Sequence, residues 1–170
     1  MHKKSEDSDL SKLCSKLTSD ADRWIKELRF HGIRPTLGYG MMLRCSDYAE
    51  RIMRGCAIVF LSTTGQEGCA HLTRIRKRVP VEKLTMGDLI RLLKGLVLAL
   101  KDKWPADDVA DEKIWSVLDL VREMRNGFMH ANEVREDPAL WMAYLEAAKD
   151  LCGTRLVHTA IEIQQGETIE

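Results

Sequence analysis

The feature that most constrains the fold is the apolar spacing, which follows the helical repeat along most of the chain and shows no convincing strand alternation. The segment from Thr85 to about Lys103 is apolar on nearly every side, which predicts a helix central to the core. Thr85 and Asp88 have the spacing of a capping box, in which Thr85 accepts from the third helical N–H and Asp88 reaches back. These patterns predict an all-α fold.

Similar spacing predicts helices on either side of this one, separated by segments rich in glycine or proline. They span Leu10 to Phe30, about Tyr39 to Leu61, Asp111 to Ala131, and Asp137 to about Gln164, the last with a break considered at Gly153. Pro35, Gly38 and Gly40 are interpreted as a loop between the first two. The basic segment from His71 to Lys83 is compatible with a loop or a short helix. We expect a helical bundle of four long helices plus a leading helix.

Length and composition limit the domain organisation and the partners. With 170 residues, 45% of them apolar, the chain is long enough for one domain with a sizeable core and too short for two comfortable ones. We expect a disordered N-terminus over residues 1–9, one domain over 10–165 and a tail over 166–170. Basic and acidic residues number 26 each, so no overall field draws nucleic acid or anionic membrane to the molecule. Any polyanion site must be local.

The five cysteines are scattered, with no Cys-x-x-Cys pair and no paired histidine spacing of the kind that binds zinc. They are interpreted as reduced core residues, and no metal or cofactor is expected. The first ten residues lack the apolar region of a signal peptide, and the longest apolar runs are too short to span a bilayer. We therefore expect a cytoplasmic protein that does not enter a membrane.

One stretch, Arg125-Asn126-Gly127-Phe128-Met129-His130, has side chains whose placement indicates chemistry rather than packing. Arg125 falls on the apolar face of its predicted helix, where a guanidinium must find an anion or acceptors because an unpaired buried charge is strongly unfavourable. Asn126 and His130 fall on the opposite face, about one turn apart. The stretch is therefore the candidate site.

Arg125-Asn126-x-x-x-His130, together with the helix start Leu84 to Ile90, resembles the motif of HEPN domains. The resemblance covers about Val81 to Asn132, and the first eighty residues match nothing that can be named. It implies an all-helical, usually dimeric bundle whose active members are metal-independent endoribonucleases of toxin–antitoxin and phage-defence systems. By this resemblance Arg125, Asn126 and His130 are the active residues.

The implied chemistry suits these side chains. His130 can act as the base for a ribose 2′-hydroxyl, which then attacks the adjacent phosphate and leaves a 2′,3′-cyclic phosphate. Arg125 can stabilise the charge on the non-bridging oxygens, and Asn126 can orient a phosphate oxygen or the imidazole. Arg125 and His130 are about 140° apart on a regular helix. Either the helix loosens near Gly127, or two chains share the groove, and we favour a homodimer.

Each of these residues has a structural alternative. Arg125 can be an ion-pair partner of Asp47 or Glu50 across the bundle, and the histidine can be a solvent-facing residue near a helix end. Asp47 with Arg51, and Glu50 with Arg54, have the spacing of intrahelical ion pairs, which more often form a solvated face than a site. If these alternatives hold, the bundle is inactive.

A second candidate for RNA contact is the basic run Arg74, Arg76, Lys77 and Arg78. It concentrates positive charge without interleaved aromatic residues, so it can follow a phosphate backbone but gives no sign of base stacking. A solvated loop is an equally good interpretation of the same residues.

The main rival to an enzyme is a binding protein. Arg125-Asn126-Gly127-Phe128-x-His130 is also similar to the Arg-Asn-x-Phe-x-His form of the mannitol-operon-repressor-like group, for which a regulatory, non-catalytic role is the usual inference. A third possibility is the HEPN partner of a nucleotidyltransferase. The expected partners are therefore RNA, a second copy of the chain, and an antitoxin or nucleotidyltransferase.

Overall fold

A computed structural model describes residues 9–32, 35–65, 69–72, 77–100, 112–131 and 138–166. Its elements are α1 (Leu10–His31), α2 (Pro35–Thr63), β1 (Cys69–Leu72), β2 (Lys77–Pro80), the 3₁₀ helix η2 (Val81–Lys83), α3 (Met86–Ala99), α5 (Glu112–Ala131), α6 (Pro138–Cys152) and α7 (Arg155–Gln165). The described residues are mostly helical, which confirms the all-α expectation at that level. Residues 1–8 and 167–170, for which a disordered end and a tail were expected, lie outside the described part, as do Lys101 to Lys103.

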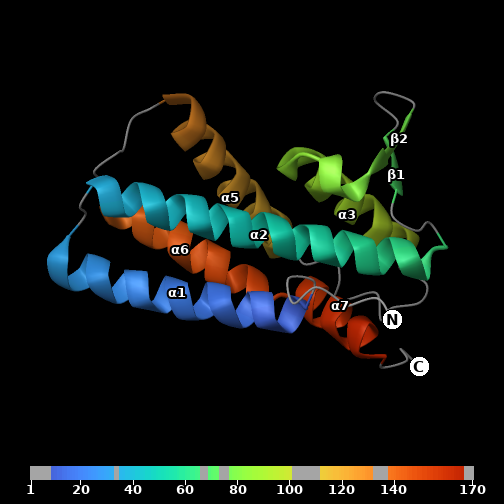
Figure 1. The fold of residues 1–170 in the computed structure, drawn as a ribbon, viewed down its shortest axis with the longest axis horizontal. Helices are drawn as coiled ribbons and strands as arrows, with labels where there is room; N and C mark the ends of the chain where they lie inside the picture. Colours follow the sequence, from blue (N-terminus) through green and yellow to red (C-terminus); the bar gives the residue numbers. More distant parts are fainter. Residues whose placement is uncertain are drawn as a thin grey trace, which may run out of the picture.

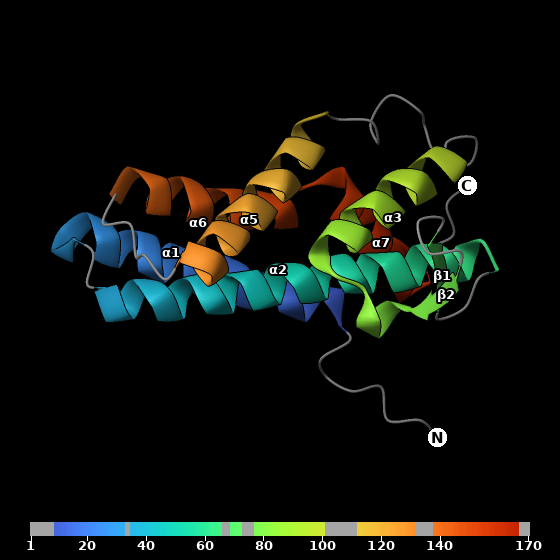
Figure 2. The same ribbon diagram turned by 90° about the horizontal axis from the view of Figure 1, so that it is seen from above.

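The centre of the molecule is α2, which packs against α1, α3, α5, α6 and α7. Figure 1 shows α1 and α6 running along its length, with α7 near one end. Figure 2 shows α3 and α5 crossing the same side of α2 obliquely. The α2 side chains Cys45, Ile52, Met53, Cys56 and Phe60 are fully buried. Within the described residues, no helix is both long enough and apolar enough to cross a membrane.

The expectation that the helix opened by Thr85 is central to the core holds only in part, although its Leu89, Ile90 and Leu93 side chains are buried in the core. This helix, α3, packs one side against α2 and α5, and its Leu98 side chain is 70% exposed. An apolar residue on the surface is common, because a folded protein has too little polar surface to cover itself. The capping box is confirmed in its main contact, since the Thr85 hydroxyl accepts from the Asp88 N–H at 3.2 Å; the same hydroxyl donates to the Asp88 carboxylate at 2.8 Å.

The first helix is held at both ends. The Asp9 carboxylate accepts from the Lys12 N–H, and the Leu10 N–H donates to the Gln164 side chain of α7 at 3.1 Å. Leu10 packs directly over Gly55 of α2, where a Cβ atom would lie 2.5 Å from Leu10 Cδ2. The helix ends at Gly32, whose φ of 67° is readily adopted only by glycine.

The expected loop at Pro35, Gly38 and Gly40 is instead the first part of α2, which begins at Pro35. Proline is favoured at the first position of a helix, because its φ angle suits the helix and its missing N–H would have no partner there. Glycine disfavours a helix by only about 1 kcal/mol, which the packing of a long buried helix can outweigh. The glycines therefore do not break this helix.

The basic segment contains a hairpin that the sequence pattern did not predict. β1 and β2 pair antiparallel, with Ala70 opposite Val79 and Leu72 opposite Lys77. Strands of four residues are too short for alternation to stand out from chance. Ala70 is buried and Val79 packs against the core, whereas Lys77 and Arg78 are exposed.

The break considered at Gly153 is confirmed, since the last predicted helix divides into α6 and α7 at that point. Thr154 caps α7 by accepting from the Val157 N–H. Deeper in the bundle, the Tyr144 hydroxyl of α6 forms a hydrogen bond of 2.7 Å with the Ser46 hydroxyl of α2. Both residues are buried, so each hydroxyl satisfies the other.

Candidate functional site around Arg125

The position of Arg125 follows from the apolar face of α5. Ile114, Leu118 and Val121 are buried on that face, and Arg125 lies one turn beyond Val121. Its Nη1 atom is 3.0 Å from the Glu50 Oε2 atom of α2, and its side chain is 35% exposed. The guanidinium therefore has an anionic partner, as expected for an arginine on the apolar face of a helix. The ion pair with Glu50, considered as the structural alternative, is present.

The Glu50 carboxylate is shared between two arginines. Its Oε1 atom accepts from Arg54 Nη2 at 2.7 Å, while Oε2 faces Arg125. Arg54 also donates to the backbone carbonyls of Glu82 and Leu84, at 2.9 and 3.1 Å. This network connects α5, α2 and the segment that leads into α3. The intrahelical pair of Glu50 with Arg54 is thus confirmed, as is the pair of Asp47 with Arg51 at 3.6 Å.

The positive charge of Arg125 also acts on the buried hydroxyl pair. Burial raises the pKa of Tyr144 above its ordinary value, and the hydrogen bond with Ser46 and the charge of Arg125 oppose that shift. Tyr144 therefore stays neutral and keeps its hydrogen bond.

The outer side of the site is open. Asn126 and Gly127 are exposed, and a Cβ atom at Gly127 would meet no atom of the described residues within 4 Å. His130 belongs to α5, but its side chain lies outside the described part. α5 is helical from Glu112 to Ala131, and Gly127 is not among the described glycines with a positive φ angle. The loosening considered near Gly127 is therefore not observed.

A second cationic group lies one turn earlier on α5. Arg122 is 3.5 Å from Asp119 and 3.8 Å from Glu123, and Lys94 of α3 is 3.9 Å from Asp119. The Arg122 Nε atom is buried and has no hydrogen-bond partner among the described residues. These contacts join α3 to α5 beside the candidate site.

The basic run and Arg125 lie on different parts of the molecule. Lys77 and Arg78 are exposed on β2, while Arg74 and Arg76 lie outside the described residues. Figures 1 and 2 both place the hairpin at one end of α2 and the carboxyl end of α5 toward the other. An RNA that contacts both must extend along the bundle.

A pocket between α1 and the α6–α7 break was missed by the sequence analysis. Cys14, Thr18, Cys152 and His158 are among its lining residues. Cys14 and Cys152 are 138 positions apart, so no local spacing could indicate their proximity. Among the described residues, no three or more His, Cys, Asp or Glu side chains form a group that could hold a metal ion.

The described residues form a mostly helical bundle. Near the carboxyl end of α5, Arg125 joins an ion-pair network in which Glu50 of α2 also pairs with Arg54. Comparisons of the chain with models of known protein families, with curated proteins and with solved structures found no match.

Proposed function

We propose that the protein is a metal-independent endoribonuclease of HEPN type, acting in the cytoplasm as a toxin or phage-defence effector. The observation that carries the proposal is the place of the Arg-Asn-x-x-x-His motif on α5. Arg125 is held by Glu50 yet is 35% exposed, and the adjacent Asn126 is exposed. A polyanion can therefore reach a guanidinium whose direction is already fixed.

In the proposed reaction His130 removes the proton from a ribose 2′-hydroxyl, which attacks the neighbouring phosphorus atom. The bond to the 5′-oxygen breaks, and a 2′,3′-cyclic phosphate remains on the first fragment. The 5′-oxygen leaves with a proton that water supplies. Arg125 stabilises the charge that develops on the non-bridging oxygens, and Asn126 orients one of them. Because Glu50 already fixes the direction of Arg125, the guanidinium has to move less to stabilise the charge on the non-bridging oxygens.

The proposed site is shared by two chains. Because α5 is regular through Gly127, Arg125 and His130 of one chain are separated by about 140° around the helix. One phosphate cannot lie squarely in front of both. A second copy packed against the open surface at Gly127 brings the arginine of one chain to the histidine of the other.

The first test is cleavage of RNA by the purified protein in the presence of a chelator. Wild type is expected to cleave and to leave 2′,3′-cyclic ends, whereas Arg125→Ala and His130→Ala lose activity by about 100-fold or more. Arg122→Ala is the matched control, because this arginine lies one turn away on α5 with a similar exposed fraction of 32%. Cleavage that requires a divalent metal, or that survives both substitutions, contradicts the proposal.

A mixing experiment tests the shared site. Equal amounts of the Arg125→Ala and His130→Ala proteins, allowed to exchange subunits, give mixed dimers that each contain one complete site. About a quarter of the wild-type activity is expected, since half of the dimers are mixed and half of their sites are complete. A site built within one chain gives no recovery.

A second candidate function is that of a non-catalytic regulator, as in the mannitol-operon-repressor-like group, or of a partner to a nucleotidyltransferase. The observation that favours it is the ion pair between Arg125 and Glu50, which gives the arginine a structural role. In that case the wild type and the Arg125→Ala variant bind RNA or a protein partner without cleaving RNA. Retained binding with no cyclic-phosphate product from any of several RNAs supports this role.

A further inference from the structure

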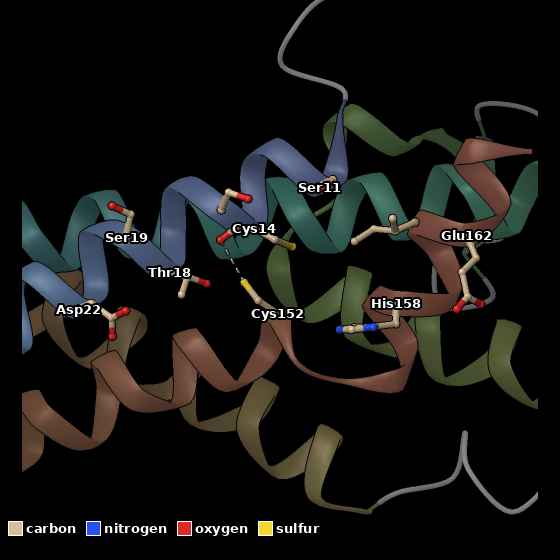
Figure 3. Close-up of a pocket in the computed structure, with 10 residues that line it drawn as sticks. Ser11, Cys14, Thr18, Ser19, Asp22, Cys152, His158 and Glu162 are labelled. Carbon is tan, nitrogen blue, oxygen red and sulfur yellow. Dashed lines mark hydrogen bonds between the residues drawn. The ribbon is translucent and has the colours of Figure 1, made fainter.

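A pocket of about 750 Å³ lies between α1 and the break from α6 to α7. Figure 3 shows it from the side, with polar α1 side chains along one wall and His158 of α7 pointing across it toward Cys152. Asp22 marks the end of this wall. Arg125 and Asn126 do not line the pocket, so it is separate from the candidate RNA site.

Two thiols meet at the pocket. Cys152 is the last residue of α6 and is partly exposed, whereas Cys14 of α1 is buried. The Cys152 thiol donates to the Cys14 carbonyl at 3.8 Å, shown by the dashed line in Figure 3. Both cysteines line the pocket. Cys152 is therefore the more accessible of the two thiols, and the Cys14 residue is its neighbour in the pocket wall.

The surroundings make the two thiols unequal. Hydrogen bonding by the Cys14 thiol lowers the pKa of Cys152, with a smaller effect of the same sign from Thr18 and an opposing effect from burial. The same hydrogen bond and burial raise the pKa of Cys14. Cys152 is also the partly exposed thiol of the two, so it is the one that a reagent in the pocket meets, and its thiolate is the nucleophilic form of cysteine. Cys14 stays protonated beside it.

We propose that Cys152 is a modification site for hydroperoxides and that Cys14 is its resolving partner, so that oxidation joins α1 to the end of α6 by a disulfide. The Cys152 thiolate attacks one peroxide oxygen, the O–O bond breaks, and the leaving oxygen takes a proton to give an alcohol or water. Cys14 then attacks the sulfur of the Cys152 sulfenic acid while its thiol proton passes to the departing hydroxyl, so that the S–O bond breaks, the S–S bond forms and water leaves. The dithiol loses two electrons and the peroxide gains two.

The proposal is independent of RNA cleavage, since it uses neither Arg125 nor His130. The new bond would close a loop of 138 positions, from the beginning of α1 to the end of α6. The remaining described cysteines differ from Cys152, because Cys45 and Cys56 are fully buried. Peroxide is therefore expected to oxidise Cys152 faster than Cys45 or Cys56.

The experiment uses the full chain with Cys69→Ala, because the Cys69 side chain lies outside the described residues. Four thiols then remain. One molar equivalent of hydrogen peroxide is expected to reduce the thiol count from four to two and the mass by about 2 Da. Peptide mapping should find the Cys14–Cys152 link, and a dithiol reductant should restore both thiols.

Two cysteine variants separate the oxidation of Cys152 from the formation of the disulfide. Cys14→Ala is expected to stop at a Cys152 sulfenic acid that dimedone traps, and Cys45→Ala, the matched buried control, should still form the disulfide. Mapping of the linked peptide in the Cys69→Ala protein keeps the test valid if Cys14→Ala does not fold. A link between any other pair overturns the proposal. So does a rate of Cys152 oxidation no greater than that of Cys45 or Cys56 in the folded protein.

Discussion

Replacing Gly127 by alanine tests the continuity of α5, on which the two-chain site depends. Gly127 lies within the helix, is exposed, and has open space where a Cβ atom would be. Alanine favours a helix over glycine by about 1 kcal/mol, chiefly because it restricts the unfolded chain, and here no steric clash opposes the gain. We expect the free energy of unfolding of the monomer to increase by about 0.5–1 kcal/mol.

For a chain of this length such a gain raises Tm by about 1–4 °C. The assay is chemical and thermal unfolding at a dilution where the protein is monomeric. Gly95→Ala in α3 is the matched control, since Gly95 is also helical, exposed and free of neighbours within 4 Å. Gly55→Ala is the opposite control, because its Cβ would meet Leu10 Cδ2 at 2.5 Å, and it should destabilise.

The same substitution also tests the proposed dimer. If a second chain approaches closely at Gly127, the methyl group should weaken association while the monomer becomes more stable. Destabilisation of the dilute monomer by Gly127→Ala, together with stabilisation by Gly95→Ala, would refute a regular helix at this point. Arg125 and His130 of one chain could then face the same phosphate, and a second chain would not be needed to complete the site.

Three other measurements test the network and the core. A double-mutant cycle between Glu50 and Arg125 should give a coupling of about 1 kcal/mol, between the values for exposed and buried pairs; a coupling near zero shows that the contact contributes no stability. Tyr144→Phe should destabilise by about 1–2 kcal/mol because Ser46 loses its partner, and adding Ser46→Ala should cost little more; simple additivity of the two losses argues against their coupling. Burial raises the pKa of Cys56 from 9.0 to about 12, so the unfolded chain loses this proton first. From pH 9 to 12 the free energy of unfolding should therefore fall by up to about 1.4 kcal/mol per pH unit, and less steeply in Cys56→Ala; equal slopes contradict the shift.

The helices were predictable because their signals are local. The cap at Thr85, the glycine at the end of α1 and the break at Gly153 act within one or two turns, and all three lie where the sequence places them. The segment that begins at Pro35 was predicted to be a loop because a proline followed by glycines is typical of loops. The packing of the buried remainder of α2 outweighs this local preference. The hairpin was missed since each strand has only four residues.

The candidate site was partly predictable for a different reason. Arg125 on an apolar face needs an anion, and helical spacing limits the choice to a few acidic residues, among them Glu50. The sequence could not show that Arg54 shares the same carboxylate and also binds two backbone carbonyls, because that depends on how α2 meets η2. The proximity of Cys14 and Cys152 likewise depends on packing between distant segments.

The hydrogen bond from the Leu10 backbone to the Gln164 side chain has a consequence for how the molecule opens. It connects the amino end of α1 to the last turn of α7, 154 positions later. Terminal helices usually unravel separately and faster than the interior. Here the two ends restrain each other, so their amide protons should exchange with solvent as one cooperative unit, and removing the final turn should release the first.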